Sequence, residues 1–314
     1  MRCLKQQIML SILNINRYLL PLVLFALALS STPSSAGGQT TLQEVYSDLD
    51  FGVLRFARLA ELPKGTVLRV DDTVIDESKL LQMVEKESPK FREELKKNLI
   101  YVLEEEVNDK LLLAEAYKNG YPKEVPEDQT ISFFKNSKIP ALSVSDEDVK
   151  AFYEENCAGL GNLSFEETAD GLKKFLLDQR REEAHKAYLL DLASSKNIQI
   201  QSSWAKENCA LARDNPVDQA RSSGKPTLVE FGATGCTGCD MMQPILSDLE
   251  RRFFGRMNVL FVHVHHFPLL ASRYRIHLIP VQAFFDKTGK EVFRHVGFYP
   301  QNEVEKKLAE MGVN

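Results

Sequence analysis

The stretch GKPTLVEFGATGCTGCDMMQP, residues 224–244, places Cys236 and Cys239 between an apolar run and a run with helical spacing. The apolar run TLVEFGAT predicts a short buried strand, and CDMMQPILSDLERRFF predicts a helix that contains a proline. Two cysteines separated by two residues can form a redox couple, half of a zinc site or a local structural crosslink. The compartment of the chain and the residues that flank the pair decide among these uses.

The bulk composition describes a globular protein with room for two domains. The chain has 314 residues, of which 44% are hydrophobic and 26% are charged. Its formal net charge is −5, and no long block of basic residues is present. We therefore expect no nucleic-acid partner.

The first 36 residues have the pattern of an export signal. Lys5 and Arg17 supply positive charge, residues 18–30 are apolar, and a small-x-small cleavage pattern ends at Ala36. This pattern predicts a cleaved signal peptide over 1–36 and a periplasmic or otherwise exported protein. The alternative is an uncleaved segment that anchors the chain in a membrane. In an oxidising compartment, disulfide chemistry becomes the leading use of cysteines.

A structural crosslink is one rival use of the cysteine pair. Closing a loop of about four residues removes only ~2 kcal/mol of unfolded-state entropy, whereas a Cys157–Cys209 disulfide would remove ~4 kcal/mol. Cys157 and Cys209 are therefore the better candidates for a structural disulfide. The sequence leaves open whether they pair, remain free thiols or include a cysteine linked to a partner.

A zinc site is the second rival. Zinc usually takes four ligands, often two such cysteine pairs or one pair with two histidines. His263, His265 and His266 lie close together in the sequence, but no second pair of this spacing exists. We therefore expect satisfied or solvent-facing histidines, no metal and no cofactor beyond a redox-active Cys236–Cys239 disulfide.

The region from 41 to 204 has mostly helical periodicity. The pattern predicts one amphipathic helix or two short ones over 41–62, a hairpin over 65–76, and irregular chain over 121–144. It also predicts further helices and a closing strand, at the following residues: a helix beginning near Glu77, a long helix over 90–119 that Gly120 stops, a helix after the capping box of Ser145 and Asp148, a long helix over about 164–196, and a strand over 197–201.

The order of these elements resembles the N-terminal chaperone region of exported folding factors of the SurA/PpiD type. The resemblance covers about residues 65–201 and is carried by VLRVDDTVIDESKLL, LIYVLEEEVNDKLLLAEAYKNGY, VSDEDVKAFYEEN and LKKFLLDQRREEAHKAYLLDLASSKNIQIQ. Those proteins usually carry a parvulin prolyl-isomerase module before the last long helix, and too few residues separate the helices here to form one. The resemblance implies a helical cradle for non-native polypeptide. The simpler interpretation is a helical domain that only positions the other half.

After Pro226 the pattern changes to strand–helix–strand–helix–hairpin–helix, which predicts an α/β domain of about 100 residues. GKPTLVEFGATGCTGCDMMQP, ASRYRIHLIPV and FFDKTGKEVFRHVG, in this order, resemble the thioredoxin family over about 215–314. We therefore expect an α+β chain of three parts. The parts are a signal peptide over 1–36, a mainly helical SurA-like domain over 37–204 and a thioredoxin fold over 205–314.

The thioredoxin resemblance gives the cysteine pair a redox role. A cysteine at the amino end of a helix faces unpaired N–H groups and the positive end of the helix dipole, which favour the nucleophilic thiolate. We expect Cys236 to attack a substrate disulfide and Cys239, one turn later, to resolve the mixed disulfide.

The resemblance also assigns roles to residues around the pair. Glu230 matches a buried acid that exchanges protons with the resolving cysteine, and Pro280 matches the family's cis-proline beside the cysteines. Pro244 matches the proline that kinks the active-site helix. The remaining candidates for substrate contact are Gly235, Thr237, Gly238, Ile279 and Gly297.

The sequence departs from the usual thioredoxin pattern at three places. Gly235 replaces a tryptophan, Thr237-Gly238 replaces Gly-Pro, and Asp240 replaces a lysine. No histidine stands between the cysteines, unlike in the strongly oxidising DsbA type, so we expect a moderately or strongly reducing couple. The expected function is an exported thiol–disulfide oxidoreductase that reduces or isomerises disulfides in non-native or disulfide-bearing clients. Its partner would be a thiol–disulfide electron donor, with a membrane-bound donor as one option, and the alternative is a holdase chaperone that uses the thioredoxin fold as a scaffold.

Overall fold

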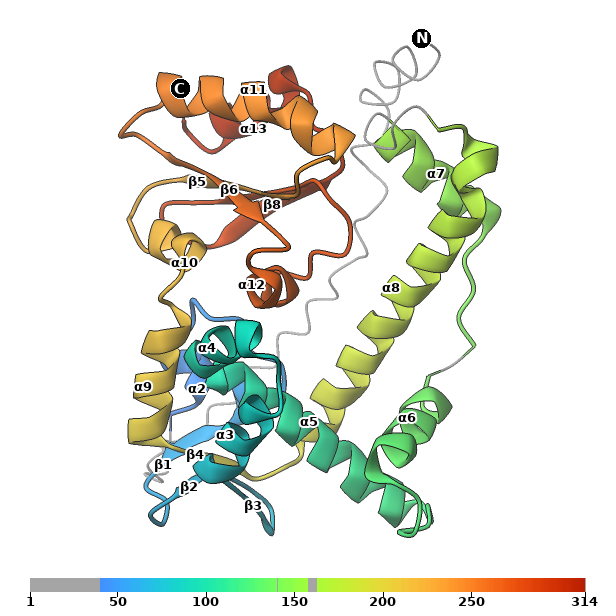
Figure 1. Cartoon of the computed structure of the whole chain (residues 1–314), viewed down its shortest axis with the longest axis vertical. Coiled ribbons are helices and arrows are strands. Elements are labelled where there is room, and N and C mark those ends of the chain that lie inside the picture. Colours follow the sequence, from blue (N-terminus) through green and yellow to red (C-terminus); the bar gives the residue numbers. More distant parts are fainter. Residues whose placement is uncertain (1–39, 140, 158–162, 314) are drawn as a thin grey trace, which may run out of the picture.

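The computed structural model describes residues 40–139, 141–157 and 163–313. The signal peptide expected over 1–36 lies outside the described residues. The described chain forms two bodies that meet through α9, α10 and α12, and the long helix α8 rises from the N-terminal body toward the C-terminal one (Figure 1). No helix among the described residues is long and apolar enough to cross a membrane.

The N-terminal body combines a small sheet with a layer of helices. The sheet has the order β1-β4-β2-β3, with β1 and β4 parallel and the other pairs antiparallel. Its strands are β1 (Arg58–Ala60), β2 (Thr66–Val70), β3 (Thr73–Asp76) and β4 (Ile198–Gln201). Its helices are α2 (Leu42–Val45), the 3-10 turn η1 (Val53–Phe56), α3 (Glu77–Glu85), α4 (Pro89–Lys97), α5 (Leu99–Lys118), α6 (Glu127–Ser137), α7 (Asp146–Asn156), α8 (Phe165–Ser194) and α9 (Ser202–Ala212).

Several predictions for this region are confirmed. β2 and β3 form the expected hairpin around a turn at Asp71, and the expected strand β4 pairs with β2. α7 begins at the predicted capping box, in which Ser145 and Asp148 each accept the other's backbone N–H. β4 lies between β1 and β2 because alternate residues Ile198 and Ile200 are buried in the core beneath the sheet.

Of the two options expected over 41–62, the structure has the two short helices, α2 and the 3-10 turn η1. Between them the chain turns inward to bury Leu49 and Phe51. The buried carboxyl of Glu104 on α5 accepts the N–H of Leu54, at 3.2 Å, and so satisfies the turn. Such a distant partner has no local sequence signal.

The single helix expected over 90–119 is in fact two, α4 and α5, which change direction at Asn98 (φ −116°, ψ 27°). Asn98 itself bonds back to the carbonyl of Glu94, at 2.8 Å. The segment 121–144, expected to be irregular, contains α6. That helix forms because Phe134 is fully buried against α5, next to Leu112.

α9 was not predicted from the sequence. It buries Trp204, Cys209 and Ala212 in the N-terminal core, which therefore extends past the boundary expected at residue 204. Cys209 is a buried free thiol, so the Cys157–Cys209 disulfide considered from the sequence does not form.

The C-terminal body has the predicted order of elements. Its sheet has the order β6-β5-β7-β8, with β5 and β6 parallel and the other pairs antiparallel. The elements are α10 (Pro216–Arg221), β5 (Thr227–Gly232), α11 (Thr237–Arg252), β6 (Asn258–His263), α12 (Pro268–Arg273), β7 (Val281–Phe285), β8 (Glu291–Val296) and α13 (Gln301–Glu310). Pro244 lies inside α11, as expected.

Both faces of this sheet are covered. Leu228 and Phe284 point toward α11 and α13, whereas Phe231 and Ala283 point toward α12 on the opposite face. Alternation along β5 therefore assigns Glu230 and Gly232 to the α11 face, together with Leu228. This assignment places the acid on the same side of the sheet as the helix that begins at the cysteines.

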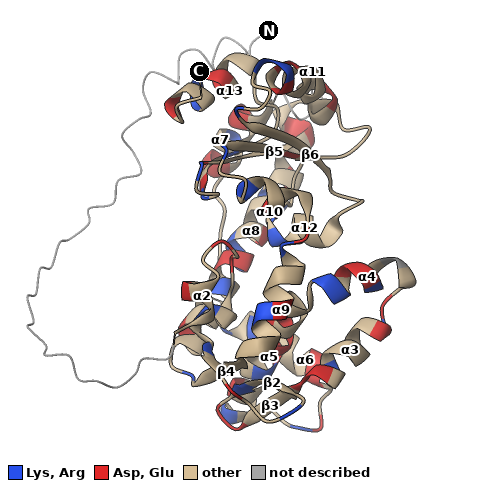
Figure 2. Cartoon of the chain, turned by 90° about the vertical axis from the view of Figure 1, so that its left-hand side faces the viewer, with Lys and Arg blue, Asp and Glu red and all other residues tan. Residues whose placement is uncertain are grey.

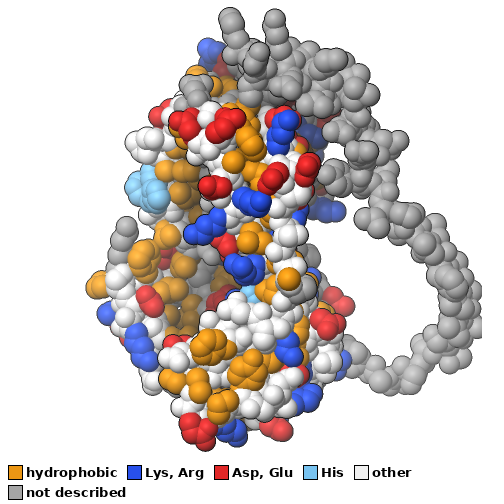
Figure 3. All heavy atoms as spheres, turned by 90° about the vertical axis from the view of Figure 1, so that its right-hand side faces the viewer, with side chains coloured by type: hydrophobic (Ala, Val, Ile, Leu, Met, Phe, Trp, Pro, Cys, Tyr) orange, Lys and Arg blue, Asp and Glu red, His pale blue; other side chains and the backbone are white. Residues whose placement is uncertain are grey.

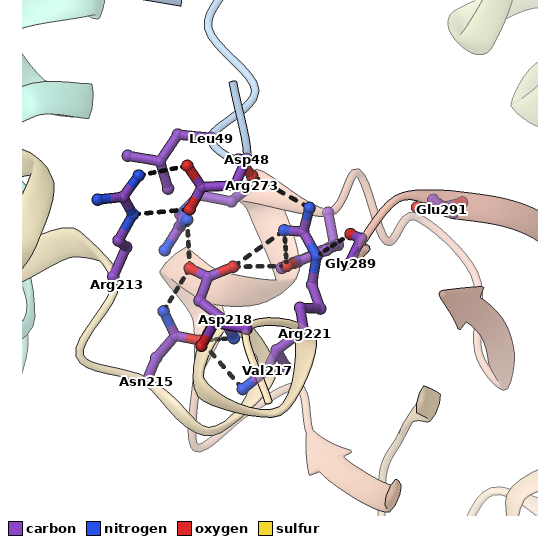
Figure 4. A network of polar contacts seen from close by, with 12 residues as sticks. Asp48, Leu49, Arg213, Asn215, Val217, Asp218, Arg221, Arg273, Gly289 and Glu291 are labelled. Carbon is purple, nitrogen blue, oxygen red and sulfur yellow. Dashed lines mark hydrogen bonds and ion pairs between the residues drawn. The ribbon is translucent and has the colours of Figure 1, made fainter. Parts of the chain in front are cut away.

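A buried polar network fixes α10 where the two bodies meet (Figure 4). The Asp218 carboxylate accepts bonds from Arg273 at 2.7 Å, from Tyr274 at 2.8 Å and from Arg221 at 3.0 Å. Arg221 also donates to the carbonyl of Asp48 in the N-terminal body, at 3.0 Å. Hydrogen-bonded, charged groups of this kind hold a defined geometry because each partner would be costly to bury alone.

Candidate active site

Cys236 and Cys239 form a disulfide at the start of α11, with their Cα atoms 5.2 Å apart. Cys236 is the N-cap residue, and its sulfur accepts the backbone N–H of Cys239, at 3.3 Å. The carbonyl of Cys236 accepts the N–H of Asp240, at 2.9 Å. Cys236 is partly exposed, whereas Cys239 is 1% exposed. One sulfur can therefore meet a partner while the other is shielded.

The predicted proline lies beside Cys236. The Ile279–Pro280 bond is cis, and the Ile279 carbonyl oxygen lies 3.8 Å from the Cys236 sulfur. Gly297 follows β8 and donates its N–H to the Pro280 carbonyl, at 2.7 Å. Cys236, Ile279, Pro280 and Gly297 are thus brought together from three separate segments of the chain.

The glycines around Cys236 leave the rim of the site open. Gly235 has φ +80°, and a Cβ there would meet no other atom within 4 Å. Thr237 is exposed and Gly238 is buried in the first turn of α11. Gly235 thus leaves open, among the described residues, the space next to Cys236 where thioredoxins usually carry a tryptophan side chain.

Glu230 is fully buried in the middle of β5. Burial raises the pKa of its carboxyl to about 8, since the charged form would lose its hydration. Neither carboxyl oxygen has a hydrogen-bond partner among the described residues.

β5 approaches the resolving cysteine closely. A Cβ on Gly232, two residues after Glu230 on the same face, would lie 3.1 Å from the Cys239 sulfur. Only glycine allows α11 to approach the strand this closely. Glu230 therefore lies on the sheet face over which Cys239 sits.

The histidine cluster adjoins the active-site loop. The N–H of Thr234, two residues before Cys236, donates to Nε2 of His263 at 3.2 Å. The ring of His266 stacks on His263 with centroids 4.0 Å apart, and His265 lies 5.6 Å away. Among the described residues, no group of three or more His, Cys, Asp or Glu side chains is arranged to hold a metal ion.

The comparisons with known proteins agree on the C-terminal body. Residues 214–312 match the family described as a thioredoxin-like domain. The thiol:disulfide interchange protein TxlA homolog of Synechocystis sp. is 31% identical over 124 residues, which cover 39% of this chain and 69% of the relative. Thioredoxin of Alicyclobacillus acidocaldarius is 32% identical over 31% of this chain and 92% of its own length. The chain belongs to the thioredoxin family.

Because its relatives are thioredoxin-family proteins, the chain is a thiol–disulfide oxidoreductase. It spans only about half of another relative, chloroplastic thioredoxin Y2 of Arabidopsis thaliana, which is 33% identical over 29% of this chain and 54% of its own length. A crystal structure of chloroplastic thioredoxin z is 25% identical, covers 30% of this chain and 85% of its own, and has a TM-score of 0.28.

Two residues near the thioredoxin-family site were not found from the sequence. Asn156, at the end of α7, places its side-chain oxygen 2.8 Å from where a Cβ on Gly297 would lie. Gln282 pairs with Glu230 across β5 and β7. Asn156 had no sequence signal because it comes from the other body. Gln282 had one, since a polar residue in the apolar run VQAFF, two positions after Pro280, is unusual in a buried strand.

Proposed function

We propose that this oxidoreductase reduces or isomerises disulfides in client proteins through Cys236 and Cys239. The observation that carries the proposal is the place of Cys236 at the N-cap of α11, where its sulfur accepts the N–H of Cys239. A donor aimed at the sulfur and the positive end of the helix stabilise negative charge there. Cys236 is also the more exposed of the two sulfurs, as the attacking group must be.

In the first step, the Cys236 thiolate attacks one sulfur of a client disulfide. The client S–S bond breaks, a bond between Cys236 and the client forms, and the other client sulfur leaves as a thiolate that takes a proton from solvent. In the second step, the Cys239 thiol gives its proton to the Glu230 carboxylate, and the resulting thiolate attacks the Cys236 sulfur. The Cys236–Cys239 disulfide forms as the bond between Cys236 and the client breaks. The client sulfur leaves as a thiolate that takes a proton, so the client carries both electrons.

Glu230 suits this second step because burial holds its pKa at about 8, near that of a thiol. A carboxyl with an ordinary pKa would be a much weaker base toward Cys239. The chemistry needs no cofactor beyond the disulfide itself.

The client groove, in this proposal, runs over Gly235, Thr237, Gly238, Ile279, Pro280 and Gly297. Ile279 and Pro280 supply backbone for an extended client segment beside Cys236, and the small residues keep the rim open. The end of α7 at Asn156 borders this groove at Gly297.

The helical half, in this proposal, holds non-native polypeptide. The SurA-like order of its helices supports this role, as does a hollow of about 410 Å³ between α3, α4, α5 and α12 that Met83, Leu95, Val102 and Leu269 help to line. Figure 3 shows hydrophobic side chains around the hollowed face between the C-terminal body and the N-terminal body. Basic and acidic residues are interspersed over the helices in Figure 2, which favours protein clients over nucleic acid.

In this proposal the clients are exported proteins. The electrons come from a thiol–disulfide electron donor that is membrane-bound or free. The sequence pattern over 1–36, which is typical of an export signal, supports this proposal. The name of the Synechocystis relative, a thiol:disulfide interchange protein, also fits disulfide exchange between proteins.

Reduction of insulin disulfides by the full chain tests the proposal. Cys236→Ala should abolish turnover, because no thiolate remains at the helix N-terminus. Cys239→Ala should instead accumulate a covalent enzyme–insulin adduct that dithiothreitol releases. Retained turnover in Cys236→Ala would contradict the redox role of this site.

The alternative, a holdase that uses the thioredoxin fold as a scaffold, is separated by a second assay. A variant with both cysteines changed to alanine should still suppress aggregation of a reduced client if the helical half binds polypeptide. Aggregation suppression without any measurable disulfide exchange in the parent protein would favour the holdase.

A further inference from the structure

Gln282 lies directly opposite Glu230 in the antiparallel pair of β5 and β7. Both residues are fully buried. Side chains opposite each other on neighbouring strands share a face, with Cβ atoms about 4.5–5.5 Å apart. Gln282 therefore faces α11 beside the carboxyl of Glu230, on the side of the sheet where Cys239 lies.

The polar side-chain atoms of Glu230 and Gln282 make no hydrogen bond to the rest of the described fold. Both oxygens of Glu230, and both the oxygen and the nitrogen of the Gln282 amide, lack a hydrogen-bond partner among the described residues. Buried polar groups are costly unless they are bonded, and the same face of β7 accommodates an apolar side chain at Phe284. Packing alone therefore gives no reason for an amide at this position.

The other strand beside Glu230 offers no polar side chain at this position, because Phe261 lies opposite Glu230 on β6. Gly232, the next residue of β5 on the same face, lies against Cys239 of α11. On the far side of Gln282, β8 contributes His295, whose Nε2 lies 3.3 Å from the carbonyl of Phe298. Burial lowers the pKa of His295, so this ring is neutral at neutral pH.

We propose that Gln282 is a positioning residue for Glu230: when the Glu230 carboxyl ionises, the Gln282 side-chain Nε2, which has no bonding partner among the described residues, donates a hydrogen bond to it and holds it toward Cys239. The inference rests on the proposed role of Glu230 in resolving the mixed disulfide. In this proposal Gln282 acts only through the acid.

A donor to the carboxylate stabilises the charged form of Glu230 and so limits how far burial raises its pKa. Without that donor the pKa rises further, and a smaller fraction of Glu230 is ionised at neutral pH. Since each unit of pKa changes the ionised fraction tenfold below the midpoint, resolution at about pH 7 should slow by about three- to tenfold. At strongly alkaline pH the two rates should converge.

The test is the pH dependence of mixed-disulfide resolution in Gln282→Met, which keeps the length of the side chain and removes its donor. The rate of release of a reduced chromogenic peptide thiol is followed in a single turnover between about pH 6 and pH 10. The expected result is a midpoint moved to higher pH, with a slower rate only below it. Phe285→Leu, on the same strand but facing the opposite side, is the matched control and should leave the midpoint unchanged.

Glu230→Gln separates the proposed role of Gln282 from the proposed role of Glu230. If it removes the pH dependence while Gln282→Met matches the parent, the role of Gln282 is wrong and that of Glu230 stands. A Gln282→Met variant that is slower by the same factor at every pH also overturns the inference, because a packing defect has no midpoint. If Glu230→Gln keeps the parent's profile, the proposed role of Glu230 itself fails.

Discussion

Glu230 shows how one residue links the stability of the fold to its chemistry. Its carboxyl is buried without a bonding partner among the described residues, and burial raises its pKa from 4.5 to about 8. In the unfolded chain the same group would ionise at an ordinary pKa. Between these values the folded protein holds a proton that the unfolded chain has lost, so stability falls as the pH rises.

Glu230→Leu should therefore stabilise the protein, and more so at alkaline pH. Each pKa unit corresponds to about 1.4 kcal/mol, so the gain above pH 8 should reach several kcal/mol, whereas the gain near pH 4 should be small. Urea denaturation of the disulfide form at several pH values measures it.

The matched control is Glu93→Leu, on an acid whose side chain is 83% exposed. It should change the free energy of unfolding by less than about 1 kcal/mol at every pH, because an exposed ion pair contributes little. If Glu230→Leu behaves in the same way, Glu230 has an ordinary pKa and cannot act as the proposed base.

At the scale of elements, α10 connects the two bodies. Asp218 is 5% exposed and accepts from Arg221 and Arg273, whose guanidinium groups are themselves largely buried. Asn215 caps the helix by accepting the N–H groups of Val217 and Asp218. The negative charge of Asp218 is therefore what allows two arginines to be buried at this joint (Figure 4).

Asp218→Asn should lower the free energy of unfolding by about 3–5 kcal/mol, because it leaves buried cations without a counter-charge. Urea denaturation is followed by circular dichroism and by the fluorescence of Trp204, the single tryptophan, which reports on the N-terminal core. Glu85→Gln, which removes an exposed ion pair with Arg92, should cost less than about 1 kcal/mol. Equal effects of the two substitutions would contradict a structural role for the joint.

The elements also show what the sequence can and cannot predict. Local patterns gave α7, α8, the β2–β3 hairpin and the whole order of the C-terminal body, since each carries its own periodicity or cap. The errors lie where a distant partner decides. α6 forms around Phe134 and α9 around Trp204.

The same distinction holds for the active site. The motif and the family resemblance led to Cys236, Cys239, Glu230 and Pro280, and the structure brings them together from separate segments. Gln282 and Asn156 become visible only through strand register and through the contact between the bodies.

At the scale of the whole molecule, the polar network at α10 joins the body that carries the redox site to the helical body. The end of α7 reaches the rim at Gly297, and His277, three residues before Pro280, meets Glu182 of α8 at 3.3 Å. The helical half thus borders the groove in which we propose that clients react. An oxidase and a reductase could share this architecture, and the difference between them lies in the energy of the Cys236–Cys239 disulfide.

The reduction potential of the Cys236–Cys239 couple is the most direct test of the account. It is measured by equilibrating the full chain with glutathione buffers and quantifying the two thiols. The account predicts a value between those of protein disulfide isomerase and thioredoxin, about −180 to −270 mV, as a reductase or isomerase requires. A value near that of DsbA, about −120 mV, would contradict it and make the protein an oxidant of its clients.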